Sequence, residues 1–243
     1  MTHPDLLIRG AYVVTMEPGA GTGARAGTAA TTRPDVGVPG DPGAGDLVGA
    51  GVLIRDGLIG AVGPSLDAPA AEVIDGRDMI LLPGLIDTHW HVWTTLLRSM
   101  AGDRAEHGYF PTTRRIGVHY EPVDMYRATM LAAAEAIDSG ITFLHDWCHN
   151  VRSPAHADAS LAALAESGIR ARFSYGWPTG DGGPVGVDVD DVARRAERWG
   201  EYAADGRLTF GLAWRGPSGG VSDVGLREVR TARELGLPIT VHA

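Results

Sequence analysis

From residue 83 onward, the sequence repeats one pattern, in which a short apolar run is followed by an amphipathic stretch of helical length. The apolar runs, which we interpret as strands, occupy residues 85–87, 141–144, 169–175, 208–214 and 238–241. The stretches interpreted as helices cover residues 121–138, 154–166, 189–202 and 223–235. Strands that alternate with helices are typical of parallel sheets built from βα units. The pattern therefore predicts an α/β fold.

The number of repeats limits the architecture further. Each βα unit takes about 30 residues or more, so residues 83–243 hold about five units. A closed (β/α)8 barrel needs eight strands and about 250 residues. We therefore expect residues 83–243 to form part of a TIM-type barrel.

The preceding residues, 1–82, show strand patterns without helical ones. Asp56-Gly57 between two apolar runs predicts a tight β-hairpin. Residues 5–16 are interpreted as two short strands that meet at Gly10. Together these patterns predict a small β-sandwich segment.

A Gly/Ala/Pro/Thr-rich stretch at residues 17–48 interrupts this segment. It has almost no large apolar side chains, so it cannot bury enough surface to offset the entropy of ordering it. We expect a loop or disordered insertion there, with a functional lid as the alternative.

Composition excludes several classes of function. A net charge of −9 argues against a nucleic-acid partner, which calls for a clustered basic face. No apolar run approaches the roughly 20 residues of a membrane span, and the first residues do not resemble a secretory signal. A single cysteine, Cys148, excludes an internal disulfide. These features predict a cytoplasmic protein.

The chain has no lysine, because all 21 of its basic residues are arginine. This excludes a Schiff-base lysine and a phosphate-binding P-loop lysine. It equally excludes a carboxylated lysine that bridges two metal ions.

Residues 83–91 read Pro-Gly-Leu-Ile-Asp-Thr-His-Trp-His, a short strand that ends in two histidines separated by one residue. Side chains alternate between the faces of a strand, so His89 and His91 point the same way. Two imidazoles directed at one point are typical of a metal site. The alternative is that one histidine packs and the other is solvated.

The motif at 83–91, the β-rich start and the Ile-Thr-Val-His sequence at 239–242 resemble the metal-dependent amidohydrolase superfamily. More narrowly, they are similar to its branch of cytosine/guanine-type deaminases and triazine hydrolases. The resemblance implies a (β/α)8 barrel flanked by a small β-sandwich. It also implies that His89, His91 and His242 are metal ligands, at the ends of strands one and five.

The same resemblance implies residues that this sequence does not contain. The family uses a histidine on strand six, an aspartate on strand eight and a proton-shuttling glutamate three residues after the strand-five histidine. All three positions fall beyond Ala243. We therefore expect a chain truncated after strand five, without the family's Glu and Asp proton carriers.

The absence of lysine also bears on how many metal ions the site is expected to hold. Binuclear members of the superfamily often bridge two ions through a carboxylated lysine on strand four, and residues 208–214 contain neither lysine nor glutamate. We expect one divalent ion, Zn²⁺ or Fe²⁺. Such an ion lowers the pKa of a bound water from 15.7 to about 7.

Barrel enzymes place their sites at the C-terminal ends of the strands. The polar and aromatic residues expected there, as substrate contacts, are His145, Asp146, His149, Trp177, Trp214 and Arg215. Tryptophan faces would stack on a planar heterocycle, and histidine or arginine would bind its edge. The alternative is helix capping by Asp146 and ordinary packing by Trp147. His3 and His156 are interpreted as surface residues.

The function predicted from these features is a metal-dependent hydrolase that acts on a carbon–nitrogen bond of a cyclic substrate. A deaminase of a small-molecule heterocycle is the leading interpretation. A ring-opening amidohydrolase, a chlorohydrolase, a truncated inactive fragment and a non-enzymatic metal-binding module are the alternatives. A homo-oligomer is left open for a full-length enzyme.

Overall fold

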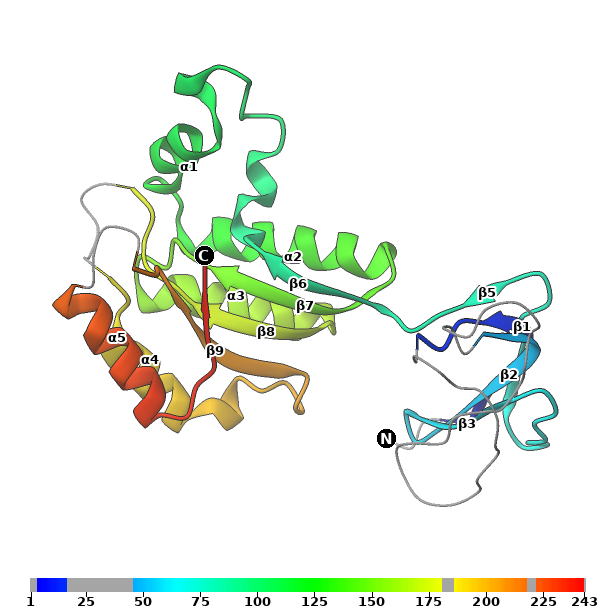
Figure 1. Ribbon diagram of the computed structural model, residues 1–243. Helices are drawn as coiled ribbons and strands as arrows, with labels where there is room; N and C mark the ends of the chain where they lie inside the picture. The colour runs from blue at the N-terminus through cyan, green and yellow to red at the C-terminus, as the bar shows by residue number, and fades with distance from the viewer. Residues whose placement is uncertain (1–3, 17–45, 181–185, 218–221, 243) are drawn as a thin grey trace. The chain divides into compact units, whose positions relative to one another are not determined.

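The computed structural model describes residues 4–16, 46–180, 186–217 and 222–242 (Figure 1). His3 and residues 17–45 of the predicted insertion lie outside this part of the chain. The chain divides into two compact units, Met1–Pro83 and Gly84–Ala243. Among the described residues, no helix combines the length and apolar character needed to cross a membrane.

The strands of the first unit form one mixed sheet, in the order β3-β2-β1-β4, with β5 also paired to β1. Strand β2 runs antiparallel to β1 and β3, whereas β4 and β5 run parallel to β1. The strands are β1 Leu6–Val13, β2 Leu47–Arg55, β3 Leu58–Gly63, β4 Glu72–Asp75 and β5 Ile80–Leu81. The segment predicted as a β-sandwich is thus one five-stranded sheet in the described residues.

Local turn chemistry explains two features of this sheet. Asp56 and Gly57 join β2 to β3 with φ angles of 49° and 75°, as a tight hairpin turn requires, which confirms the predicted hairpin. The expectation of two strands meeting at Gly10 is wrong. Strand β1 continues through Gly10, whose φ of 82° accompanies a shift in register, so the glycine makes a bulge and not a break.

The second unit is built on a parallel five-stranded sheet in the order β10-β9-β8-β7-β6, which confirms the predicted α/β architecture. Its strands are β6 Leu85–Trp90, β7 Ile141–Cys148, β8 Arg170–Tyr175, β9 Leu208–Trp214 and β10 Ile239–Val241. Its α-helices are α1 Tyr109–Gly117, α2 Pro122–Asp138, α3 Pro154–Ser167, α4 Val189–Glu197 and α5 Asp223–Glu234. Short 3-10 helices cover η1 Val92–Leu97, η2 Ala105–His107 and η3 Trp199–Glu201.

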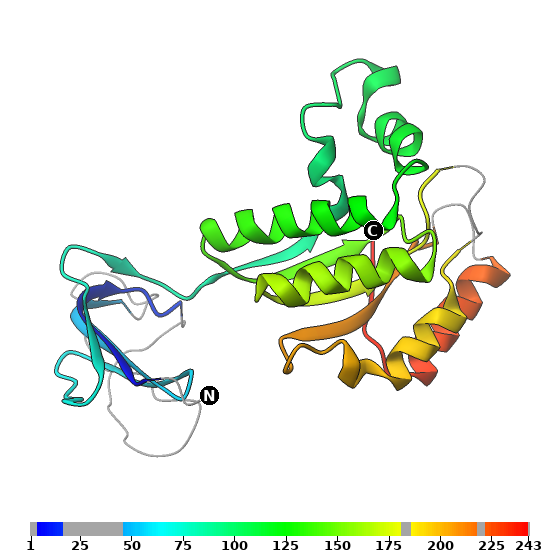
Figure 2. The ribbon, with the colours of Figure 1, turned by 180° about the vertical axis from the view of Figure 1, so that it is seen from behind.

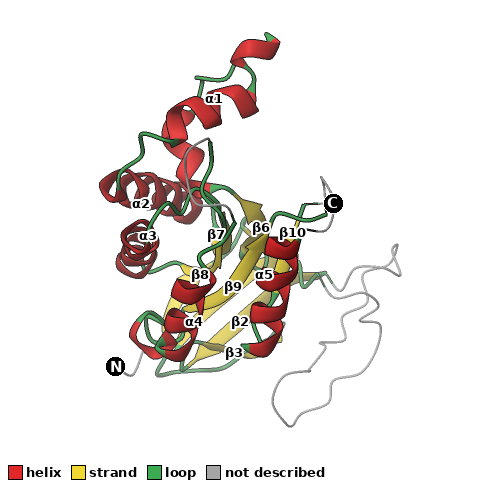
Figure 3. Ribbon diagram, turned by 90° about the vertical axis from the view of Figure 1, so that its left-hand side faces the viewer, coloured by secondary structure: helices red, strands yellow, loops and turns green. Residues whose placement is uncertain are grey.

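The apolar core of this unit lies between one face of the sheet and the helices (Figures 1, 2 and 3). Alternate residues of the strands, such as Leu144, Phe173 and Leu212, point into that core. The residues between them face the other side of the sheet. On β7 these are His145 and Trp147, so the second face carries polar and aromatic side chains.

Helix α1 and the short η1 and η2 lie where no helix is predicted, and β6, β7 and α4 differ by more than one residue from their predicted ranges. Strand β7 continues to Cys148, so His145 and Asp146 lie within the strand and do not follow it. The predicted helix at 189–202 is a shorter α4 followed by η3. In β7 the His145 ring is accommodated within the strand because its two nitrogens contact the Thr88 carbonyl oxygen and the Ser174 hydroxyl.

Arg195 of α4 joins three elements through a buried ion network. Its side chain is 2% exposed and contacts Asp191 through Nε at 2.9 Å and Asp158 through Nη1 at 2.7 Å. Its Nη2 donates to the Pro154 carbonyl, at the start of α3, at 2.8 Å. The Tyr175 hydroxyl, at the end of β8, donates to Asp191 at 3.0 Å. The network therefore links α4 to α3 and to the sheet.

The interpretation of His156 as a surface residue is wrong. Its side chain is buried, with one ring nitrogen 2.8 Å from the Ser153 hydroxyl and the other 3.0 Å from the Tyr120 carbonyl oxygen. A buried imidazole with both nitrogens satisfied is a structural link between α3 and the loop before α2.

Candidate metal centre

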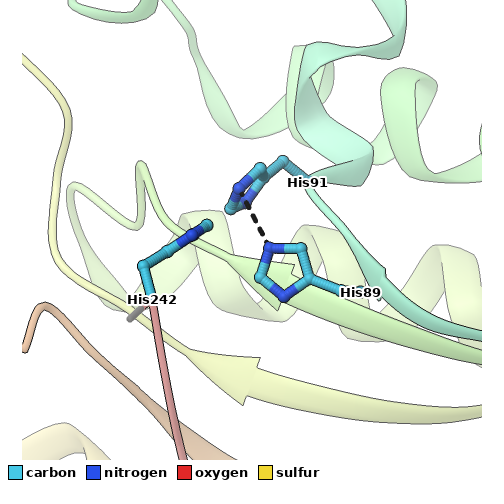
Figure 4. Close-up of side chains that lie close together, drawn as sticks. All are labelled: His89, His91 and His242. Carbon is cyan, nitrogen blue, oxygen red and sulfur yellow. Dashed lines mark hydrogen bonds between the residues drawn. The ribbon is translucent and has the colours of Figure 1, made fainter.

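Three histidines from the two outermost strands of the second sheet converge on one point (Figure 4). His89 lies in β6, His91 follows it by two residues, and His242 comes directly after β10. One ring nitrogen of each lies within 4.8 Å of those of the other two. Among the described residues this is the group arranged to hold a metal ion.

The spacing between His89 and His91 fits a metal ion well. Their Nε2 atoms are 3.4 Å apart. Two ligand atoms on a tetrahedral zinc ion, with bonds of about 2.0–2.1 Å, lie roughly 3.3–3.4 Å from each other. The two side chains lie side by side, as alternation along a strand predicts, and leave room for a shared ion.

The surroundings of His89 and His91 favour their neutral forms. The pKa of His91 is lowered to about 4, mainly by burial and also by the nearby His89 and His242, against the opposing contact with the Trp147 carbonyl. The pKa of His89 is also lowered, first by burial and then by His242 and His145. A neutral imidazole has the lone pair that a metal ligand needs.

A backbone contact fixes which nitrogen of His91 is free. Its Nδ1 lies 2.9 Å from the Trp147 carbonyl oxygen, which can only accept a hydrogen bond. His91 therefore carries its proton on Nδ1 and presents Nε2 toward His89. A donor bond from the second ring nitrogen to a carbonyl is the usual support for a metal-binding histidine.

His145 lies next to the three histidines, but both of its nitrogens are engaged by the protein. Nδ1 is 2.8 Å from the Thr88 carbonyl oxygen, and Nε2 is 2.8 Å from the Ser174 hydroxyl. The imidazole thus bridges β6, β7 and β8 just before His89. This geometry favours a supporting role over the predicted substrate contact.

Asp146 lies on the opposite face of β7, so the structure does not bring it to the histidines. The carboxyl group is fully buried, and neither oxygen has a partner with full hydrogen-bond geometry among the described residues. The pKa of this carboxyl is raised to about 8, because the effect of burial outweighs the opposing contacts with the Val92 amide and the Cys148 thiol. Asp146 is therefore a neutral carboxylic acid at pH 7.

We expect this buried carboxyl to make the fold less stable as the pH rises. Because its pKa is raised from 3.8 to about 8, the folded state holds a proton that the unfolded state has lost. The free energy of unfolding then falls by up to about 1.4 kcal/mol per pH unit. Between pH 6.5 and 8 the lowered pKa values of His89 and His91 act in the opposite direction, because the unfolded chain still binds protons there, so the effect of Asp146 is read from the difference between the wild type and a variant without this carboxyl.

Urea denaturation of the wild type and of Asp146→Asn across this range tests that expectation. Relative to the variant, the wild type should lose stability as the pH rises toward 8. Parallel profiles for the two proteins would show that Asp146 is ionised in the fold.

Trp147, Trp177 and Arg215 form a row that leads away from the metal ligands. The Trp147 ring lies 4.5 Å from the His242 ring and 5.0 Å from the Trp177 ring, measured between centroids. The Arg215 guanidinium lies 4.7 Å above Trp177. Trp214, by contrast, packs toward the helical layer against Gly225 of α5 and is not brought to the histidines.

His149, directly after β7, lies behind the metal ligands and not in this row. Its Nδ1 is 3.0 Å from Nδ1 of His91. Trp147 is not among the predicted substrate contacts, although its ring lies next to the His242 ring. The signal that could have found it is its spacing of two residues from His145, which places both side chains on one face of β7.

Comparisons with known proteins agree with this fold. A model of the amidohydrolase family matches residues 80–243. The chain is 30% identical over 213 residues to a 5′-deoxyadenosine deaminase of Methanosarcina acetivorans, covering 84% of this chain and 40% of that protein. It is 31% identical over 219 residues to a 5-methylthioadenosine/S-adenosylhomocysteine deaminase of Moorella thermoacetica, covering 83% and 46%.

Among solved structures, the atrazine chlorohydrolase of Arthrobacter aurescens TC1, complexed with zinc, superimposes with a TM-score of 0.67 at 20% identity. The match covers 98% of this chain and 52% of the other. The chain thus spans about half the length of these proteins.

Proposed function

The chain belongs to the amidohydrolase family, and on this premise we propose that it carries the metal-binding part of a deaminase that acts on an aromatic heterocycle. The observation that supports the proposal most strongly is the convergence of His89, His91 and His242. Deaminases among its relatives, named for 5′-deoxyadenosine and 5-methylthioadenosine, favour adenine nucleosides as the substrate class.

His89, His91 and His242 would hold one divalent ion. Three neutral imidazoles suit zinc, with ferrous iron as the alternative, and three protein ligands leave a position open for water. When bound, the ion would lower the pKa of that water so that hydroxide forms at neutral pH. The single-ion stoichiometry rests on the missing lysine and on the three-histidine donor set.

The row formed by Trp147, Trp177 and Arg215 would bind the substrate. A planar heterocycle matches the flat faces of tryptophan side chains, and the guanidinium offers hydrogen-bond donors to a ring edge or to a sugar oxygen. Trp177 supports this role best, because its partly exposed ring lies between Trp147 and the Arg215 guanidinium, whereas Trp147 is only 1% exposed and packs against it. The substrate would then be held beside the ion.

Metal analysis and a deaminase assay on the purified 243-residue chain test the proposal. We expect one zinc ion per chain, and release of ammonia from 5′-deoxyadenosine or 5-methylthioadenosine would establish the deaminase reaction for this chain. Two ions per chain would contradict the mononuclear centre, and the absence of bound metal would contradict the centre itself. One bound ion without ammonia release would support the inactive-fragment alternative. Chloride release from a chlorotriazine, without deamination, would support the chlorohydrolase alternative.

A further inference from the structure

We propose that His149 is a positioning residue that holds His91 in the ring orientation and tautomer needed for metal binding. The proposal rests on the metal centre described above, in which His91 is a ligand. It differs from the predicted role of His149 as a substrate contact.

The contacts of His149 form a buried chain of hydrogen bonds. The side chain is 8% exposed, and its Nδ1 lies 3.0 Å from Nδ1 of His91. The same Nδ1 lies 3.3 Å from Nε1 of Trp93, a fully buried residue of η1. The His149 ring also packs edge-to-face against the rings of His91 and Trp93, with centroid distances of 4.4 and 5.1 Å.

These contacts determine the protonation of both imidazoles. Because the Trp147 carbonyl can only accept, Nδ1 of His91 is a donor. Because the Trp93 indole nitrogen can only donate, Nδ1 of His149 is an acceptor. The single Nδ1–H of His91 is then shared between the Trp147 carbonyl oxygen and Nδ1 of His149, so that both acceptors hold His91 in this tautomer. His149 carries its proton on Nε2, and His91 keeps the lone pair of Nε2 for the ion.

The indole that supports His149 is itself fixed in the core. The Tyr120 hydroxyl donates to the Trp93 carbonyl at 3.1 Å, and the two rings pack edge-to-face with centroids 5.2 Å apart. A rigid support of this kind limits how far the His91 ring can rotate. Residues behind a metal ligand typically change metal affinity by about 10–100-fold when they are replaced.

Ordinary packing is the competing explanation, and it makes a different prediction. If His149 only fills space, an aromatic ring of similar size should replace it without loss. If it acts as an acceptor, phenylalanine should fail, whereas asparagine should succeed because its side-chain oxygen takes the place of Nδ1.

The decisive experiment measures Zn²⁺ affinity by competition with a chromophoric chelator for wild type, His149→Phe and His149→Asn. We expect His149→Phe to bind zinc about 10–100-fold more weakly and His149→Asn to stay within about threefold of wild type. Equal affinities for wild type and His149→Phe would overturn the proposal. So would an equal loss in both variants.

His156→Phe is the matched control. His156 is also a buried histidine with both nitrogens satisfied, but its partners are Ser153 and Tyr120 and not a metal ligand. Its replacement should lower the melting temperature without changing zinc affinity. A loss of affinity in this control equal to that of His149→Phe would assign the effect to general destabilisation.

Imidazole ¹⁵N chemical shifts of the metal-free wild type provide a test that needs no variant to fold. We expect the Nδ1–H tautomer for His91 and the Nε2–H tautomer for His149. An Nδ1–H tautomer at His149 would contradict the proposal, whatever the variants show. Failure of the wild type to bind zinc would instead contradict the metal centre, so the two failures can be told apart.

Discussion

Replacing His91 with alanine should weaken Zn²⁺ binding by more than about 100-fold, beyond the 10–100-fold range typical of residues behind a ligand. The variant loses one of the three converging imidazoles. In the wild type, Nε2 of His91 lies only 3.4 Å from Nε2 of His89, as expected for two ligands of one ion. His242→Ala should show a comparable loss, because it removes a ligand of the same ion. Chelator competition measures both.

His119→Ala is the control for these two variants, because His119 is an exposed histidine of the second unit outside the cluster. It should bind zinc as the wild type does. If His91→Ala and His242→Ala also kept wild-type affinity, the zinc site would have to lie elsewhere. If only one of them lost affinity, the ligand set would need revision.

Replacing Arg195 with methionine should lower the free energy of unfolding by about 3–5 kcal/mol, the usual cost of removing one member of a buried ion pair. The loss arises because Asp191, only 1% exposed, would lose its buried partner and keep only the exposed Arg194. Urea denaturation followed by tryptophan fluorescence measures it. All six tryptophans belong to the unit Gly84–Ala243, so the signal reports on that unit.

The neighbouring Arg194 provides a matched control. Its side chain also contacts Asp191 but is 53% exposed, so Arg194→Ala should cost no more than about 1 kcal/mol. Adding Asp191→Asn to Arg195→Met should recover part of the stability, because it removes a buried charge that only the exposed Arg194 would still pair. Equal losses for the two arginine variants would show that burial does not strengthen the Arg195 pair.

Apart from α1, the sequence was sufficient to predict the order of the strands and α-helices of the second unit, because the signals that define them are local. Helix α2, for example, begins with a capping box between Glu121 and Asp124 around Pro122, and its last residue is followed by Ser139-Gly140. The extension of β7 was not predictable in this way. The polar residues His145 and Asp146 resemble a loop until their partners on other strands are known.

In the candidate site, too, some features follow from local sequence and others depend on residues that are distant in the chain. The shared direction of His89 and His91 follows from alternation along a single strand. The roles of His149 and His156 depend on Trp93 and on the Tyr120 carbonyl, groups that are distant in sequence and are brought close only by the fold. A histidine's burial therefore could not be read from its neighbours in the chain.

The three converging histidines come from β6 and β10, the two strands that border the second sheet. An ion held by all three would act as a cross-link between the borders of the sheet and would close a long loop of chain. A cross-link of this kind restricts the unfolded chain, and an ion that binds only the folded form stabilises it in proportion to occupancy. Strand β10 has three residues and, among the described strands, pairs only with β9. The bound ion would therefore stabilise the position of β10 more than that of the other strands.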